Sequence, residues 1–199
     1  LLSASVAVAQ SSPPPAAPVT IRIVQTNDLD RMGEEKGRGG FARLAAVVKA
    51  EKAKGDTFFV HAGDTISPSL LSGFDKGAHV IDILNRMGVD VFTPGNHEFD
   101  FGAQNFRERM AQATFDIVST NIFEKDGSRP ANLKPEKIVD VKGIKIAFFG
   151  LTTETTPTVS SPGPDIEFRS TIDMARSKAK ELREGGADIV VAVAHTPLA

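Results

Sequence analysis

Short apolar runs recur along the chain and are separated by stretches with a different, helical periodicity. Most of these runs are rich in Val, Ile and Phe and are apolar on both faces, as is usual for strands of a sheet that is covered on both sides. Six of them span residues 19–25, 57–62, 89–94, 115–120, 144–150 and 187–194. We predict a strand in each.

Between these runs, apolar residues recur at the three- and four-residue spacing of one helix face. The stripes are formed by Phe41, Leu44, Ala45 and Val48, by Val80, Leu84 and Met87, by Phe106, Met110 and Ala113, and by Ile172, Ala175, Ala179 and Leu182. Gly185 and Gly186 would end the last of these helices. Alternating strands and helices predict an α/β domain with a largely parallel sheet.

Two segments depart from that alternation. Residues 137–149 have the pattern of a hairpin that turns at Lys142 and Gly143, which makes the predicted sheet mixed rather than purely parallel. Residues 152–165 are rich in Thr, Ser and Pro and follow a strand, so we predict a surface loop there.

Polar residues follow four of the predicted strands. Asp28 and Asp30 follow the first, Asp64 the second, Asn96 the third, and His195 the last. Ligands of open α/β sheets bind at the carboxyl ends of the strands, so these side chains are expected to converge. Carboxylate, amide and imidazole donors together suit Mn²⁺, Fe, Zn²⁺ or Mg²⁺.

The spacing of Asp28 and Asp30 leaves three interpretations open. On an extended chain, residues i and i+2 point to the same side, which favours a pair of metal ligands. The same Asp-x-Asp pattern occurs as nucleophile and acid in aspartyl-phosphate phosphatases. A solvated turn is the third interpretation.

Composition narrows the function classes. The 199 residues suffice for one domain with a core, or for one domain and part of another. A formal net charge of −2 provides no basic surface that would favour a nucleic-acid polymer as partner. The chain has no cysteine, which excludes disulfides, thiolate metal ligands and a cysteine nucleophile. No apolar run is long enough to predict a membrane span.

The first 18 residues differ from the rest. They carry no charge, and Ala7-Val8-Ala9 fits the small-x-small pattern of a signal-peptide cleavage site. With neither an initiator Met nor a basic leading region, the start of the gene is expected to be missing. We predict that residues 1–18 are a signal-peptide remnant and Pro-rich linker, that residues 19–199 are the folded domain, and that the protein is secreted or periplasmic.

Four motifs in order, "TNDLD", "HAGDTISPS", "FTPGNHEFDFG" and "VAHTPL", resemble the 5′-nucleotidase branch of the calcineurin-like metallophosphatases. The resemblance extends from about residue 20 to residue 199, and it implies that residues 19–199 are a partial catalytic domain without its final strands and C-terminal substrate domain. It implies a layered α/β sandwich with mixed, largely parallel sheets around two divalent metal ions. It also implies hydrolysis of nucleotides or related phosphoesters by attack of a metal-bound water.

The resemblance assigns metal ligands by position. Asp28 matches a ligand of the first metal, and Asp64 matches the carboxylate that bridges both metals. Asn96 and His195 match ligands of the second metal. Two ions held about 3.5–4 Å apart in this way clamp the attacking and leaving oxygens of a phosphoryl transfer.

The resemblance also assigns two residues that do not bind metal. His97 matches the histidine that stabilises charge on the phosphoryl group and the leaving oxygen, and Asp100 matches the acid that orients it. Asn96 and His97 are the expected substrate contacts. We expect His61 and His79 to pack or to face solvent, and Asn121 to support the site from behind.

Two features depart from the family pattern. Asp30 stands where the family has a histidine ligand, so it either ligates in its place, supports the site indirectly, or leaves the first metal weakly bound. Ligation by Asp30 would favour the harder ions Mn²⁺, Mg²⁺ or Fe²⁺ over Zn²⁺. The chain also ends four residues after His195, before a later Gly-His-x-His motif and the substrate domain, so we expect the fragment alone to bind metal poorly and to be inactive.

Three alternatives complete the predictions. The aspartyl-phosphate phosphatases need Thr or Val where this chain has Met32, and they make no use of "GNHE", so that interpretation is set aside. A thiohydrolase acting on a sulfur-oxyanion conjugate at the same kind of site stays open. So does a catalytically impaired secreted binding module, which Asp30 favours and the intact His97 and Asp100 oppose.

Overall fold

The computed structural model describes residues 18–130 and 132–197. The predicted signal-peptide remnant and linker lie outside these residues, apart from Pro18. None of the helices in the described part of the chain combines the length and the apolar character that crossing a bilayer requires.

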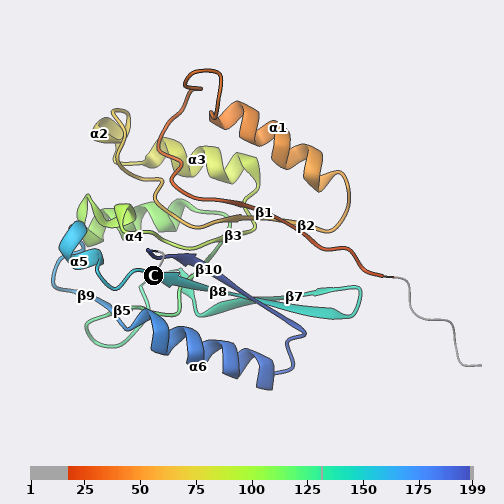
Figure 1. Cartoon of the computed structure of the whole chain (residues 1–199). Coiled ribbons are helices and arrows are strands. Elements are labelled where there is room, and N and C mark those ends of the chain that lie inside the picture. Colours follow the sequence, from red (N-terminus) through yellow and green to blue (C-terminus); the bar gives the residue numbers. More distant parts are fainter. Residues whose placement is uncertain (1–17, 131, 198–199) are drawn as a thin grey trace, which may run out of the picture.

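Two sheets form the centre of the molecule (Figure 1). All strand pairs of the first sheet are parallel, and its order is β1 (Arg22–Thr26), β2 (Thr57–His61), β3 (Val91–Phe92), β4 (Asp116–Val118) and β6 (Leu133–Lys134). The second sheet has the order β10 (Ile189–His195), β8 (Ile144–Thr152) and β7 (Glu136–Val141). In it β10 and β8 are parallel and β7 and β8 antiparallel, which confirms the predicted hairpin and the mixed, largely parallel α/β fold.

The four predicted helices are present as α1 (Phe41–Lys52), α3 (Ala78–Met87), α4 (Gly102–Gln112) and α6 (Thr171–Glu184). Sequence patterns explain two of their ends. Gly88 ends α3 in the left-handed conformation, and the Ser170 side chain accepts the N–H of Asp173, in the first turn of α6. The short elements α2 (Ser72–Asp75), η1 (His97–Phe99), α5 (Thr156–Val159), β5 (Ile122–Glu124), β6 and β9 (Ile166–Phe168) were not predicted.

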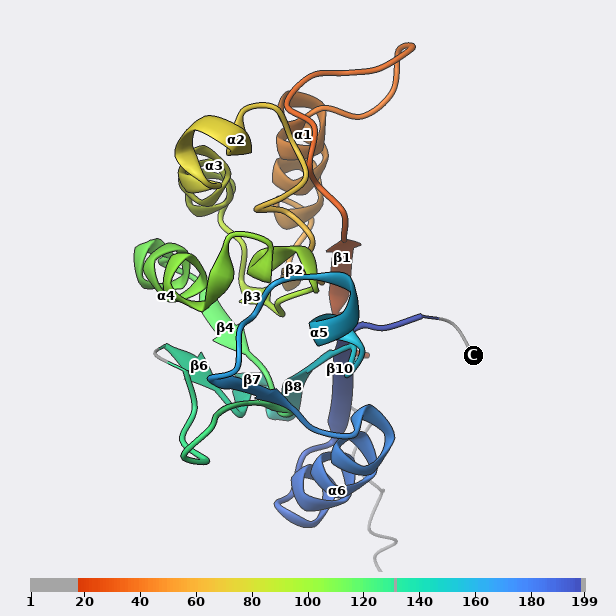
Figure 2. The same ribbon diagram turned by 90° about the vertical axis from the view of Figure 1, so that its left-hand side faces the viewer.

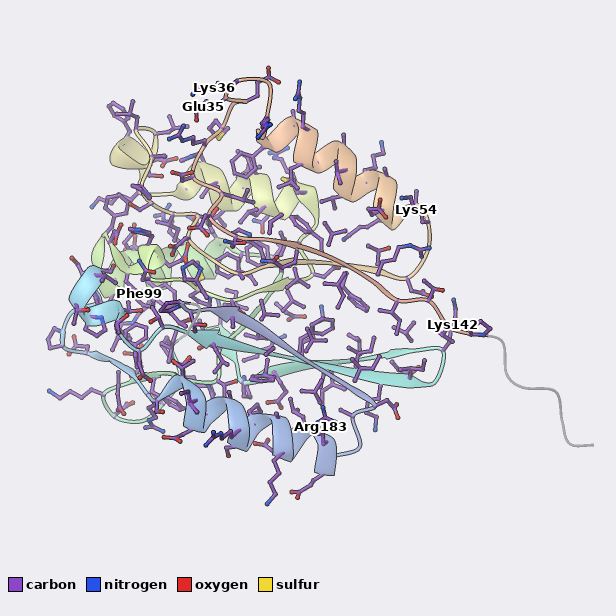
Figure 3. All side chains as sticks on the ribbon, in the orientation of Figure 1. Glu35, Lys36, Lys54, Phe99, Lys142 and Arg183 are labelled. Carbon is purple, nitrogen blue, oxygen red and sulfur yellow. The ribbon has the colours of Figure 1, made fainter. Side chains whose placement is uncertain are left out.

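Three apolar cores separate four layers (Figure 2). The first lies between α1, α3 and α4 and one face of the first sheet, and it contains Phe99, which is labelled in Figure 3 and stacks on Phe106. The second joins the two sheets and contains Val60 and Phe148. The third joins the second sheet to α6. The result is an α/β/β/α sandwich.

Strand alternation places the residues of β2 in different cores. Phe59 packs in the core under the helices, whereas Val60 and Ala62 pack between the two sheets. His61 shares the face of Phe59, and its ring lies 5.4 Å from that of Phe92. It is fully buried, which confirms that it packs in the interior.

The turns that follow β2 and β3 are in direct contact. A Cβ atom at Gly63 would lie 2.1 Å from the backbone nitrogen of Gly95, and one at Gly95 would lie 2.2 Å from Asp64 Oδ1. Gly63 also has a φ of +73°, in the left-handed region that glycine tolerates best. Glycine at both positions therefore lets the two turns meet.

A buried carboxylate ties these turns together. Glu98 is fully buried and accepts backbone N–H groups from Asp64 at 2.8 Å, Thr65 at 2.7 Å, Ile66 at 3.2 Å and Gly95 at 2.5 Å. Burial raises the pKa of Glu98, the charge of Asp64 adds to the rise, and the N–H donors oppose it. Its carboxylate satisfies donors that would otherwise be unpaired in the interior.

The prediction of a surface loop over residues 152–165 is only partly correct. Thr152, Thr153 and Thr156 are buried, and α5 interrupts the segment. Thr152 Oγ1 donates to the Pro94 carbonyl at 2.5 Å, and Thr156 Oγ1 donates to the Thr153 carbonyl at 2.7 Å. A threonine hydroxyl that donates to a backbone carbonyl has its hydrogen bond satisfied and can be buried. A segment of polar composition can therefore lie in the interior, which the composition alone does not predict.

Replacing His61 with Phe should make stability less dependent on pH. Burial lowers the pKa of His61 from 6.5 to about 3, against hydrogen bonding with Thr26, so between these pH values the unfolded chain binds a proton that the folded chain excludes. The parent is expected to lose up to roughly 1.4 kcal/mol per pH unit at this position as the pH falls through that window. Urea unfolding at pH 7.5 and pH 4.5 measures the difference, and equal losses in parent and His61→Phe would contradict it.

Replacing Glu98 with Gln should destabilise the fold and displace Asp64. The amide offers one acceptor oxygen and turns an NH₂ group toward N–H donors, so we expect a loss of roughly 2–4 kcal/mol in the free energy of unfolding. Chemical unfolding monitored by circular dichroism measures it. Glu108→Gln on the exposed side of α4 is the matched control and should change stability by less than about 0.5 kcal/mol. A Glu98→Gln variant as stable as this control would refute the role.

Candidate metal centre

Three of the predicted metal ligands meet at the carboxyl ends of the strands. Asp28, Asp64 and His195 each offer one ligand atom, and these atoms all lie within 4.8 Å of one another. Asp28 follows β1 and Asp64 follows β2, whereas His195 is the last residue of β10 in the other sheet. The three side chains converge as predicted, but the group spans two sheets, whereas the argument from strand ends assumed one.

Asp64 lies at the centre of the group. It is 5% exposed, and its backbone has a φ of +58°, which Asp tolerates better than most residues. Its Oδ1 accepts the backbone N–H of His97 at 2.8 Å, and its Oδ2 lies 3.0 Å from His195 Nε2. The carboxylate thus contacts the turn after β3 and the end of β10 at the same time.

His195 is oriented by a backbone group. Its Nδ1 donates to the Ala62 carbonyl at 2.6 Å, so its Nε2 faces Asp64 Oδ2. Histidine ligands of metals commonly donate their other N–H to a carbonyl in this way. Burial opposes protonation, but the hydrogen bond and charge of Asp64 outweigh it and raise the pKa of His195 to about 9. His195 Nε2 and Asp64 Oδ2 thus form a pair that favours a cation, either a proton or a metal ion. The carboxylate and imidazole donors of the group fit a divalent metal.

The two aspartates of the first motif are placed differently. Asp28 is exposed, has a φ of +54°, donates its N–H to the Gly63 carbonyl at 2.9 Å and accepts the Asn27 amide on its side chain. Because this backbone is not extended, the argument that Asp28 and Asp30 share a side does not apply. Asp30 is half-buried and lies outside the three-residue group, although both aspartates line one hollow of about 650 Å³.

Asn96 faces a second hollow that opens onto the group. This hollow of about 810 Å³ is lined by Asn96, Asp28 and His195, and by Thr153 and Thr155 from the segment after β8. Asn96 therefore lies beside the carboxylate–imidazole group, as its strand-end position predicted. The two threonines were not expected there.

His97 and Asp100 form a second pair beside Asp64. His97 Nδ1 donates to Asp100 Oδ2 at 2.6 Å, and His97 Nε2 lies 4.0 Å from Asp64 Oδ2. Burial opposes the charged form of His97, but the hydrogen bond to Asp100 and the charges of Asp64, Asp100 and Glu98 raise its pKa above the ordinary value. A proton on Nε2 would thus be retained more readily than on a free imidazole.

The remaining predictions concern residues around the site. His79 is paired with Asp75 at 2.9 Å, and His61 is buried, so neither belongs to the group. Asn121 bonds to the carbonyl and N–H of Thr152 at 2.7 and 3.0 Å, and so supports the end of β8. Sequence reasoning missed Glu98 and the Ala62 carbonyl, although Glu98 belongs to the quoted motif "GNHE" and offered a signal.

Known proteins share this arrangement of elements. The family model described as calcineurin-like phosphoesterase matches residues 21–199. The chain is 32% identical to a snake venom 5′-nucleotidase of Gloydius brevicauda, over 88% of this chain and 33% of that protein.

Two solved structures are similar in fold as well as in sequence. The NAD nucleotidase of Haemophilus influenzae has a TM-score of 0.80 and 28% identity over 88% of this chain and 34% of its own. A 5′-nucleotidase precursor from Thermus thermophilus has a TM-score of 0.79 and 28% identity over 88% of this chain and 37% of its own. The chain spans about a third of the length of the curated relatives it matches. By a family match that covers residues 21–199, this chain belongs to the calcineurin-like phosphoesterases.

Proposed function

We propose that the protein containing this chain is a metal-dependent phosphoester hydrolase of the 5′-nucleotidase type, acting on nucleotides or related small phosphoesters. The observation that carries the proposal is the carboxylate of Asp64, shared between His195 Nε2 and the backbone of His97 within a group that includes Asp28. The names of the relatives, 5′-nucleotidases and an NAD 5′-nucleotidase, support the substrate class.

The proposed cofactor is a pair of divalent ions, chosen among Mn²⁺, Zn²⁺, Mg²⁺ and Fe. Asp28, Asp64, Asn96 and His195 would hold them, with Asp64 as the shared ligand. Bound metals supply positive charge that acidifies a water molecule and stabilises the phosphoryl group. The clustering of anionic and imidazole donors at one end of both sheets supports this proposal.

His97 is proposed to act on the leaving oxygen of the substrate. Its Nδ1 is committed to Asp100, so its Nε2 is the atom that can hold a proton near the reacting group. Burial opposes the charged form, but the hydrogen bond to Asp100 and the nearby carboxylates raise the pKa of His97, which favours a proton on this atom. We further propose that Asn96 and His97 contact the substrate, because Asn96 lines the hollow beside the group.

The predicted location, secreted or periplasmic, stays a proposal. The small-x-small pattern near residue 9 and the venom origin of one relative support it.

Replacing Asp30 with His should shift the preferred metal. If Asp30 ligates, its hard carboxylate favours Mn²⁺, Mg²⁺ or Fe²⁺, and an imidazole at that position should raise the affinity for Zn²⁺ relative to Mn²⁺ by about tenfold. Competition titrations of the full-length protein with both metals measure the ratio. Asp140→His, in the exposed hairpin at the opposite end of β8, is the control and should leave the ratio unchanged. The same Zn²⁺ preference in parent and Asp30→His would show that Asp30 does not ligate.

The full-length protein should release phosphate from a nucleoside 5′-monophosphate in a metal-dependent reaction. Asp64→Asn removes the shared charge and is expected to lower kcat/KM by at least about 10³. The present 199-residue chain alone should show little or no turnover on 4-nitrophenyl phosphate with Mn²⁺. Phosphate release measured by a colorimetric assay, with and without a chelator, tests all three statements.

Measurements of sulfate release and of metal content, made on the full-length protein alongside the phosphate assay, separate the alternatives. Turnover of a thiosulfate-type conjugate without turnover of nucleotides would favour the thiohydrolase. Metal binding without turnover of either substrate would favour the impaired binding module. Substantial activity of the 199-residue chain would show that further ligands are not needed.

A further inference from the structure

The carboxylate of Asp100 has a second partner that comes from a distant part of the chain. Its Oδ2 accepts His97 Nδ1 at 2.6 Å, while its Oδ1 accepts the hydroxyl of Ser160 at 2.7 Å. We propose that Ser160 is a positioning residue for His97 that acts through Asp100; the proposal rests on the phosphoester hydrolysis proposed above. The chain Ser160–Asp100–His97 would hold the imidazole in one orientation toward Asp64.

The segment after β8 places the Ser160 hydroxyl. Ser160 has an extended backbone, with φ of −148° and ψ of −168°, and its N–H donates to the Thr156 carbonyl at 2.9 Å at the end of α5. Thr156 is fully buried, and its hydroxyl bonds to the carbonyl of Thr153. Ser160 is therefore fixed to a short, internally bonded segment and not to a free loop.

The same segment is attached to the other side of the site. The N–H of Thr153 donates to the carbonyl of His195 at 2.9 Å. One short stretch of chain thus touches the end of β10, which carries His195, and the carboxylate that orients His97. Thr153 and Thr155 of this segment also line the hollow that contains Asn96 and His195.

Both oxygens of Asp100 must be held if its hydrogen bond is to fix the imidazole. The terminal torsion of an aspartate is broad, so a carboxylate with one partner can rotate. Ser160 occupies the second oxygen, which limits that rotation and leaves His97 Nε2 4.0 Å from Asp64 Oδ2. The rate of a reaction falls steeply when a catalytic group is displaced from its reactive position. The loss of the Ser160 hydroxyl is therefore expected to lower the rate measurably.

A purely structural role for Ser160 makes different predictions. If the hydroxyl only closes the segment after α5, its loss would lower activity equally for all substrates and independently of His97. If it positions the imidazole, its loss should matter most when the leaving oxygen needs a proton. It should not matter when His97 is already gone.

The test uses the full-length protein with Mn²⁺ and the variants Ser160→Ala and Ser160→Thr. Ser160→Ala should lower kcat for a nucleoside 5′-monophosphate by about tenfold, lower it less than about twofold for 4-nitrophenyl phosphate, whose leaving group needs no proton, and leave KM unchanged. Ser160→Thr keeps the hydroxyl and should retain most activity. The neighbouring exposed Ser161→Ala is the matched control.

A double variant makes the test stricter. In a His97→Ala background, adding Ser160→Ala should cause no further loss of kcat. Equal losses on both substrates, a persistent loss in the His97→Ala background, or an unchanged kcat in Ser160→Ala would overturn the proposal.

A measurement on the metal-free protein tests the role of Ser160 separately from the proposed phosphoester hydrolysis. Proton NMR of the metal-free full-length protein should show a downfield His97 Nδ1–H resonance, assigned by its disappearance in His97→Ala. The resonance should broaden by faster exchange in Ser160→Ala and stay unchanged in Ser161→Ala. If the parent hydrolyses no phosphoester, the proposed function fails, and this resonance alone decides the role of Ser160. An identical resonance in Ser160→Ala would refute it.

Discussion

Asp64 keeps its position because two strand-end turns approach each other more closely than any side chain at Gly63 or Gly95 would allow. Glu98 joins these turns by accepting N–H groups from both, so the backbone that carries Asp64 is bonded to the backbone that carries His97. From that junction the remaining geometry follows: Oδ1 of Asp64 is occupied by the turn after β3, and only Oδ2 is left to face the two imidazoles. The position of the Asp64 carboxylate is thus set by the contact between the two backbone turns, independently of a bound ligand.

Much of this arrangement could be predicted from the sequence, because it follows from local patterns. Runs rich in Val, Ile and Phe located the strands, and the spacing of residues such as Val80 and Leu84 located the helices. Parallel strands in register bring their carboxyl ends together, so the residues that follow them were expected to converge. The grouping of Asp28 with Asp64 confirms that argument, whereas His195 reaches them from the other sheet because the two sheets pack face to face. The assignment of their metals remains a prediction.

The rest could not be predicted, either because it depends on hydrogen bonds between residues distant in sequence or because the local backbone differs from what was assumed. The Ala62 carbonyl orients His195 across 133 positions, and Ser160 reaches Asp100 across 60. The Thr-rich segment was expected to be exposed because its composition is polar, but its hydroxyls bond to nearby backbone and allow burial. The argument from Asp28 and Asp30 failed for a local reason: it assumed extended backbone, and Asp28 is left-handed.

The four-layer architecture has a consequence for the energetics of the chain. Asp28 and Asp64 come from the first sheet and His195 from the second, and the apolar layer containing Val60 and Phe148 packs these sheets together, with hydrogen bonds such as that from His195 Nδ1 to the Ala62 carbonyl joining them at the site. Any cation that bridges Asp64 and His195 therefore also acts as a clamp between the sheets. The free energy of ion binding therefore stabilises the packing of the two sheets. A substitution that weakens the apolar layer between the sheets is expected to lower the affinity for the ion. Affinity for the ion and packing of the two sheets are thus thermodynamically linked, so that a change in one is expected to change the other.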